Sequence, residues 1–276
     1  MKPLGEIQIM KKFLKTLLKC LSYFIIWALL VGIPISDSLS PALWRFFAEL
    51  LPLILLIIIS LVYMKFVDKD FYDLKLKEKK IINYFKGIIL GIIWIISAIG
   101  ISMITKSITI SGKNSINIFI WGISLLLNTL MQELLIRGYL YQMLRKKYNV
   151  IIAFVFTTCL FTLLHGGAFE AGLFAVINVI SMSLFMTLLL EYYNSLIIPI
   201  LVHFIWNFVG GLIFDVVSLA SDYPHILNTI SSENLLLSGG TFKIEGSIIV
   251  SILNIAFVTI YAILLYKKRK QNVINS

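Results

Sequence analysis

Apolar runs of about 20 residues recur along the whole chain and constrain its fold more than any other feature. A helix of that length spans the hydrocarbon core of a bilayer. Hydrophobic residues make up 59% of the 276-residue chain, against roughly 45–50% in soluble domains, and the mean hydropathy is +0.94. The sequence therefore predicts an all-α polytopic membrane protein, a single integral membrane domain over residues 1–276, and excludes a soluble globular fold.

Hydropathy predicts eight transmembrane helices. The predicted spans are Leu17–Ile35, Ala48–Phe66, Gly87–Ile104, Ile116–Leu144, Val150–Leu164, Ala171–Tyr192, Leu196–Phe214 and Ser247–Tyr266. The first follows a lysine-rich arm but has no small-x-small cleavage site, so we interpret it as a retained span rather than a secretory signal. The segment Asp215–Gly246 is expected to be an exposed loop. Cys20 and Cys159 are expected to be small buried hydrophobic residues.

The distribution of positive charge predicts the orientation. Most of the 24 Lys and Arg residues fall on one side of the predicted membrane, in four groups: Lys2–Lys19, Lys65–Lys86, Arg145–Lys147 and Lys267–Lys270. The positive-inside rule then places both the N- and C-termini in the cytoplasm. This topology accounts for the net charge of +10, so the lipid bilayer is the expected setting of the protein and no nucleic-acid partner is expected. The basic segment Lys75–Lys86 could bind anionic lipid head groups, but a solvated segment that determines topology is the preferred interpretation. The Ile-, Lys- and Asn-rich composition suggests a bacterial protein, and hence a bacterial cytoplasmic membrane.

The fourth predicted span contains an unusual group of polar side chains. Gln132, Glu133 and Arg137 lie within it, although each charge at the centre of a membrane helix costs about 2.5–3.5 kcal/mol on insertion scales. Such residues are by default functional. The alternative is structural, because the i,i+4 spacing of Glu133 and Arg137 also suits a buried ion pair that locks the bundle.

Two more i,i+4 pairs lie at similar depth in other spans. Phe161 and His165 end the fifth span, and His203 and Asn207 lie in the seventh. At 1.5 Å per residue, Glu133 and Asn207 lie about 18 Å from the cytoplasmic side, His165 about 22 Å and His203 about 12 Å. These groups can therefore meet at mid-membrane. Phe-x-x-x-His is a weak motif in a chain with 19 Phe residues, and the seventh-span pair could equally hydrogen-bond neighbouring helices.

Such a cluster could support hydrolysis in several ways. A carboxylate can act as general base toward water, and an imidazole and an amide can stabilise a developing oxyanion. The side chains of Glu133, His165 and His203 could also ligate Zn or another divalent metal, with a metal-free Glu/His site as the alternative. A transporter that uses the polar cluster as a solute path is a further alternative, but the sequence has no internal repeat of the kind found in many transporters.

Three motifs together resemble a known family. Gln132-Glu133-Leu-Leu-Ile-Arg137, Phe161-Thr-Leu-Leu-His165 and His203-Phe-Ile-Trp-Asn207 resemble the Glu-Glu-x-x-x-Arg, Phe-x-x-x-His and His-x-x-x-Asn motifs of the CPBP (CAAX protease and bacteriocin-processing, or Abi) intramembrane endopeptidases. The resemblance covers residues 116–211, which would form the catalytic core.

The resemblance implies a role for each motif residue. In such a site His165 would activate water together with the first motif Glu, directly or through a metal. The oxyanion would be held by His203 and Asn207, while Arg137 and Glu133 would shape the site. The substrate would be a membrane-associated protein or peptide precursor, with roles in peptide maturation, bacteriocin immunity or regulation.

The chain departs from the family at one position. Gln132 stands where the family has its first Glu, and an amide cannot take up a proton at neutral pH. Glu133 points about 100° away around the helix. Three explanations stay open: Glu133 serves as the base of a variant site, the protein is a non-catalytic immunity or regulatory member, or Gln132 was introduced to silence the enzyme.

Overall fold

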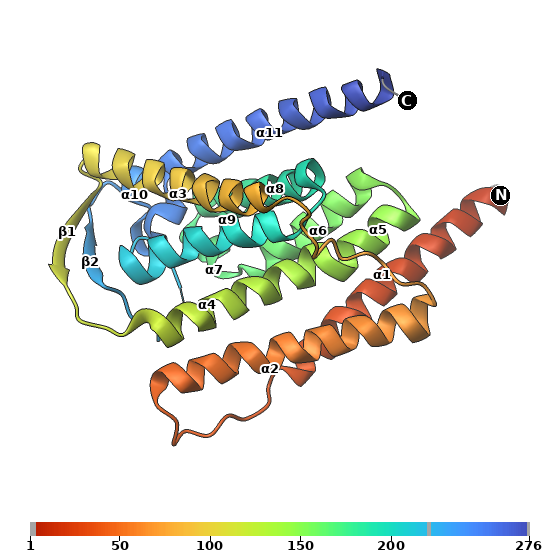
Figure 1. The fold of residues 1–276 in the computed structure, drawn as a ribbon, viewed down its shortest axis with the longest axis horizontal. Helices are drawn as coiled ribbons and strands as arrows, with labels where there is room; N and C mark the ends of the chain where they lie inside the picture. Colours follow the sequence, from red (N-terminus) through yellow and green to blue (C-terminus); the bar gives the residue numbers. More distant parts are fainter. Residues whose placement is uncertain (1–3, 220–221, 275–276) are drawn as a thin grey trace.

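The computed structural model describes residues 4–219 and 222–274, a bundle of long helices with both described chain ends at the same end of the bundle (Figure 1). Lys2 of the predicted N-terminal basic group lies outside the described residues. The first half contains α1 Leu4–Leu30, α2 Pro41–Val62, a π-helical turn η1 Tyr63–Asp68, α3 Ile81–Ile104, β1 Ile108–Lys113, α4 Ile118–Glu133, a π-helical turn η2 Leu134–Leu140 and α5 Tyr141–Lys147. The second half contains α6 Val150–Leu164, α7 Gly167–Ala171, α8 Leu173–Tyr193, α9 Ile197–Asn207, a π-helical turn η3 Phe208–Ile213, β2 Leu227–Ser231, α10 Leu235–Ser238, a 3-10 helix η4 Gly240–Gly246 and α11 Ile248–Ile274.

Helices make up most of the chain, so the all-α prediction is confirmed. Among the described residues, six helices are long and apolar enough to cross a membrane. They are Met10–Leu30, Pro41–Asp68, Ile81–Ile104, Ile118–Lys147, Leu173–Tyr193 and Gly240–Ile274. The predicted fifth and seventh spans correspond to shorter apolar helices, Val150–Leu164 and Ile197–Ile213. The number of eight spans and the cytoplasmic side of the termini stay predictions.

The helix ends differ from the predicted spans where a helix stops within an apolar segment or continues into a polar one. The first helix ends at Leu30, before Gly32 and Pro34, rather than at Ile35. The last continues to Ile274 rather than Tyr266, because the Lys- and Arg-rich tail loses hydropathy but keeps good helix propensity.

The outer surface of the bundle is apolar, as expected for contact with lipid. Exposed side chains along α2, α3 and α11 include Ile54, Ile57, Ile58, Leu61, Ile89, Ile92, Ile93, Ile96, Ile252, Ile255, Ile260 and Ile263. By contrast, α8 lies inside the bundle and packs against α6, α9 and α11. Cys20 is buried as expected, but the expectation is wrong for Cys159, which faces outward from α6. Both cysteines are free.

The segment 215–246 is not the exposed loop that its composition suggested. Its strand β2 pairs antiparallel with β1, from Ile108 opposite Ser231 to Lys113 opposite Leu227. Figure 1 shows this pair at the end of the bundle away from both termini. The side chain of Ile244 is fully buried. The prediction failed because two short strands that pair over more than a hundred residues leave no local periodicity to detect.

Two of the π-helical turns directly follow motif residues. The turn Leu134–Leu140 begins after Glu133 and contains Gly138, whose ψ of −107° kinks the helix. The turn Phe208–Ile213 begins after Asn207. Such turns are rare and often lie at functional sites, because the extra residue rotates the side chains that follow.

Candidate active site

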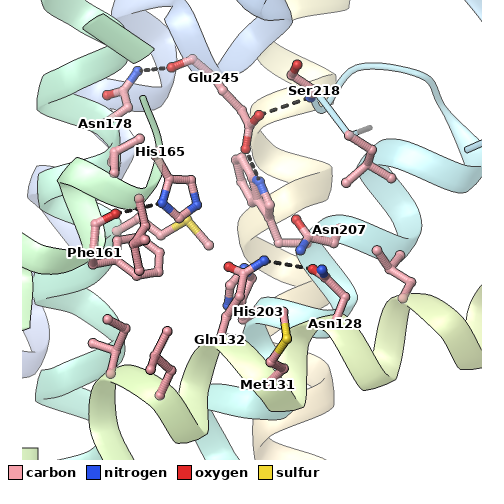
Figure 2. Close-up of a pocket in the computed structure, with 18 of the residues that line it drawn as sticks. Asn128, Met131, Gln132, Phe161, His165, Asn178, His203, Asn207, Ser218 and Glu245 are labelled. Carbon is pink, nitrogen blue, oxygen red and sulfur yellow. Dashed lines mark hydrogen bonds between the residues drawn. The ribbon is translucent and has the colours of Figure 1, made fainter. Parts of the chain in front are cut away.

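Four of the six predicted site residues line one cavity in the bundle. It measures about 360 Å³, within the usual range for small-molecule and cofactor sites. Gln132, His165, His203 and Asn207 all line it, from α4, the end of α6 and α9 (Figure 2). Most other lining residues are apolar, among them Leu125, Met131, Leu135, Met182 and Trp94. The cavity thus combines a few polar groups with a mostly apolar wall.

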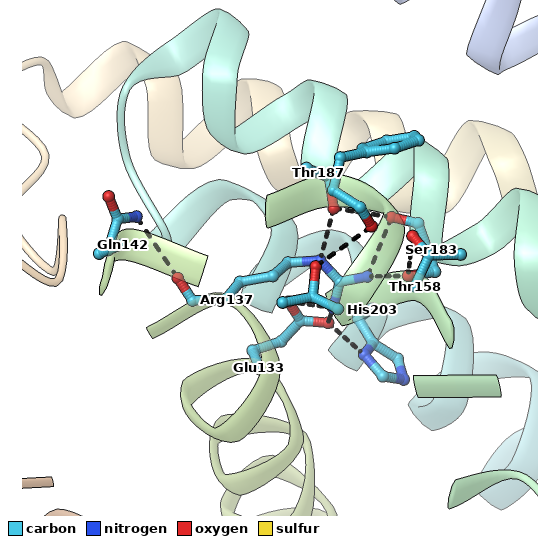
Figure 3. Close-up of polar contacts among 9 residues, drawn as sticks. Glu133, Arg137, Gln142, Thr158, Ser183, Thr187 and His203 are labelled. Atoms are coloured by element: carbon cyan, nitrogen blue, oxygen red, sulfur yellow. Dashed lines mark hydrogen bonds and ion pairs between the residues drawn. The ribbon is translucent and has the colours of Figure 1, made fainter. Parts of the chain in front are cut away.

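The other two predicted residues, Glu133 and Arg137, lie behind the cavity wall as an ion pair. Both side chains are fully buried. Nη1 of Arg137 donates to both oxygens of Glu133, at 3.0 and 2.9 Å. Its Nη2 donates to the carbonyl and the hydroxyl oxygen of Ser183, and its Nε donates to Oγ1 of Thr187 (Figure 3). These bonds join α4 and the following turn to α8, so the structural alternative for this pair is supported by its geometry.

Glu133 also holds the imidazole of His203. Nδ1 of His203 lies 2.8 Å from Oε1 of Glu133, and a carboxylate can only accept, so Nδ1 carries the hydrogen. His203 is 2% exposed and lines the cavity. Nε2 is thereby left as the ring nitrogen available to a ligand.

His165 is oriented by the end of its own helix. Its Nδ1 lies 2.8 Å from the carbonyl oxygen of Phe161, one of the last-turn carbonyls that have no partner within the helix. Because a carbonyl oxygen only accepts, Nδ1 is the protonated nitrogen and Nε2 keeps its lone pair. The Phe161 ring, 4.2 Å away between centroids, packs against the imidazole. The i,i+4 spacing of this motif therefore serves to fix a histidine that faces the cavity.

Gln132 is oriented by a chain of polar residues. Nδ2 of Asn128 donates to Oε2 of Glu49 at 2.8 Å, which leaves Oδ1 of Asn128 to accept from Nε2 of Gln132 at 2.7 Å. The remaining atom, Oε1 of Gln132, is buried without a hydrogen-bond partner among the described residues. The side chain of Asn207 likewise lines the cavity. Both amides are thus available to a bound ligand.

Sequence reasoning missed a carboxylate in the cavity. Glu245, in the 3-10 helix before α11, lines the same space as His165 and Gln132 (Figure 2). Its Oε1 accepts from Nε1 of Trp206 at 3.1 Å and its Oε2 accepts from the backbone N–H of Ser218 at 3.0 Å. No sequence pattern marked it, because it has no i,i+4 partner and belongs to the segment interpreted as a loop.

The predicted metal ligands do not fit a metal ion as they are arranged. Among residues 4–219 and 222–274, no group of three or more His, Cys, Asp or Glu side chains is placed to hold one. Of the three proposed ligands, Glu133 already bonds Arg137 and His203 and lies behind the cavity wall.

Comparison with known proteins points to one family. Residues 114–209 match a family model described as "Type II CAAX prenyl endopeptidase Rce1-like". This segment contains all three motifs, so the match confirms the resemblance to the CPBP endopeptidases there. No curated protein and no solved structure matches the chain.

Proposed function

From the match of residues 114–209 to this protease family model, we propose that the chain is an intramembrane endopeptidase. It would hydrolyse a peptide bond in a membrane-associated protein or peptide precursor. The observation that carries this proposal is the convergence of His165, His203 and Asn207 on one cavity, although they come from different helices. Acyl transfer to water needs a water-orienting group and oxyanion donors around one point, and these residues supply both.

The oxyanion would form beside α9. Nδ2 of Asn207 can donate to the carbonyl oxygen of the scissile bond as it gains negative charge. When His203 is protonated, its Nε2 donates to the same oxygen, while Glu133 fixes the ring from the other side. Because His203 and Asn207 are one helical turn apart, one oxygen can contact both. Loss of one such donor typically lowers kcat by about 100- to 1000-fold.

The attacking water would be oriented by His165. Its unprotonated Nε2 accepts a hydrogen bond from the water, since Nδ1 is committed to the carbonyl of Phe161. The ion pair behind the wall has a positioning role in this proposal. Glu133, itself held by Arg137, keeps the Nδ1–H of His203 directed at its carboxylate and holds the ring in one rotamer. This replaces the sequence-based hypothesis that Glu133 is itself the base, since its side chain is fully buried and does not line the cavity.

The cavity wall favours an apolar substrate segment. Trp94, Leu125, Met131 and Met182 contribute to it, so burying apolar side chains of a peptide there would supply binding energy of roughly 25 cal/mol per Å². A lipidated or membrane-embedded peptide fits this description. The family model is described as a CAAX prenyl endopeptidase, which makes a prenylated C-terminal peptide the first substrate to test.

The proposal is tested by cleavage in proteoliposomes. Purified protein is incubated with a farnesylated peptide ending in a CAAX sequence and with a panel of transmembrane-anchored peptides, and products are identified by mass spectrometry. We expect cleavage by the wild type, none above background for His165→Ala, and a loss of about 100-fold or more for Asn207→Ala. His225→Ala is the matched control, because His225 lies in the segment 215–246 and does not line this cavity. Undiminished cleavage by His165→Ala would refute the proposal.

One observation favours a second candidate function. At position 132, where the family has its first Glu, this chain has Gln132, whose side-chain amide is hydrogen-bonded to Asn128. An amide cannot serve as a general base. A non-catalytic member would bind a membrane peptide in the cavity and act as an immunity or regulatory protein. This alternative predicts that the wild type retains a labelled peptide without cleaving it. It also predicts that Leu125→Trp, which fills the cavity, abolishes this retention.

A further inference from the structure

The proposed hydrolysis needs a group that takes a proton from water and later returns it to the leaving amine. At position 132 the structure favours an amide rather than a carboxylate. The carboxylate of Glu49 only accepts, so Asn128 must donate to it and must present its own oxygen to residue 132. A Glu at 132 would set a carboxylate oxygen against that amide oxygen. The surrounding hydrogen bonds therefore suit Gln132, and the proton acceptor has to come from elsewhere.

One carboxylate in the described part of the chain does line the cavity, and it is Glu245. It lies outside the residues that match the family model, 114–209. Figure 2 shows its side chain reaching into the space that His165, Gln132 and Asn207 surround. No Lys, Arg or His side chain of the described residues forms an ion pair with Glu245, in contrast to the paired Glu49 and Glu133.

The backbone around Glu245 is held in place from several directions. Nδ2 of Asn178, on α8, donates to the carbonyl oxygens of both Glu245 and Ser247, at 2.8 and 2.9 Å. The turn before it requires glycine, because Gly239 has a φ of +78° and a Cβ there would lie 1.6 Å from the carbonyl oxygen of Lys243. This anchoring fixes the carboxylate relative to α8 and α9, as precise proton transfer requires.

We propose that Glu245 is the general base of this site and replaces the carboxylate that position 132 lacks. The inference rests on the proposed peptidase function. One hydrogen of the attacking water is donated in a hydrogen bond to Nε2 of His165. The other is transferred as a proton to the Glu245 carboxylate while the water oxygen forms a covalent bond to the scissile carbonyl carbon. The tetrahedral intermediate then collapses, the C–N bond breaks, and the proton on Glu245 moves to the leaving nitrogen. The products are a carboxylic acid and an amine, and Glu245 is again ionised.

The hydrogen-bond donors at Glu245 suit this role. The indole N–H of Trp206 and the amide N–H of Ser218 stabilise the ionised form that starts the reaction. Each carboxylate oxygen can accept a second hydrogen bond, which leaves a lone pair for the water. Arg45, His165 and His203 also line the cavity. Lys243, two residues before Glu245, forms an ion pair with Asp215.

The test compares variants of Glu245 in the proteoliposome cleavage assay. Removal of a general base typically costs about 100- to 10,000-fold in rate, so we expect Glu245→Gln to lose at least about 100-fold. Glu245→Asp keeps the acid and should retain measurable activity. Glu233→Gln makes the same change at an exposed position of the same segment, 215–246, and should cleave like the wild type. Glu245→Ala leaves space for a small carboxylate, so added formate should restore part of its activity.

The outcomes separate this inference from the function on which it rests. Loss of activity in Glu245→Gln together with rescue of Glu245→Ala by formate supports the base role. Wild-type rates for Glu245→Gln overturn it and leave the peptidase proposal intact. Inactive Glu245 variants with a lowered unfolding temperature and no response to formate also overturn it, since Glu245 would then act only in folding. Absence of cleavage by the wild type refutes the peptidase function itself.

Discussion

Replacement of Arg137 by Met tests how much the buried ion pair contributes to the fold. The substitution keeps an unbranched side chain but leaves the fully buried Glu133 carboxylate with His203 as its remaining partner. Breaking a buried pair by removing one member costs about 3–5 kcal/mol. The lost bonds to Ser183 and Thr187 add smaller amounts, about 0.6 kcal/mol each in a membrane bundle. We expect a decrease in the free energy of unfolding of about 5 kcal/mol.

The measurement is unfolding by SDS in mixed micelles, followed by circular dichroism, in a double-mutant cycle with Glu133→Gln. The double variant carries no buried charge from this pair, so it should be more stable than the sum of the single variants predicts, by about 2–3 kcal/mol. Arg145→Met is the matched control, because the Arg145 side chain is 40% exposed and exposed cations of this kind contribute about 0–1 kcal/mol. Its partner Glu191 also keeps Arg269 and Tyr141 as partners. A loss for Arg137→Met no larger than for the control, or strictly additive effects, would refute the reasoning.

Three further predictions concern packing, hydrogen bonding and metal dependence. Gly91→Ala should destabilise the protein by about 1–3 kcal/mol, because its Cβ would lie 2.8 Å from Cβ of Ile205 where α3 and α9 pack. Gly100→Ala, on the same helix, adds a Cβ that meets no atom within 4 Å and should leave the stability unchanged. Equal stability of the two variants in SDS unfolding would contradict this. Tyr139→Phe should cost about 1 kcal/mol by removing the hydroxyl that donates to Asp68 at 2.6 Å, and an unchanged unfolding midpoint would count against it. Treatment with a chelator should leave peptide cleavage unchanged, since the donor set does not fit a metal; loss of cleavage that is restored by added Zn²⁺ would contradict this.

Depth along the helices predicts only that polar residues of different helices can meet at one level of the bundle. Helical rise places His165 and Asn207 at similar depths, and both line the cavity. Depth does not predict which side of a helix faces which neighbour. Helix geometry separates the adjacent residues Gln132 and Glu133 by about 100°, but only the packed bundle shows that Gln132 faces the cavity while Glu133 pairs with Arg137 behind it.

Other features left no local trace in the sequence. Strand pairing between β1 and β2 depends on contacts far apart along the chain. Glu245 is a single carboxylate in a segment without periodicity, and only the packing of η4 against α8 and α9 brings it to the cavity. The polar chain from Glu49 to Gln132 likewise depends on α2 packing against α4. Sequence patterns report local structure, whereas these features arise from tertiary packing.

The most direct measurement of hydrolysis in this cavity is cleavage of a membrane-anchored peptide in water enriched in ¹⁸O, with the new C-terminus analysed by mass spectrometry. We predict one ¹⁸O atom in the new C-terminal carboxylate of the wild-type product and no such product from His165→Ala. A wild-type preparation that yields no ¹⁸O-labelled product, or a His165→Ala variant that yields as much as the wild type, would contradict the central claim.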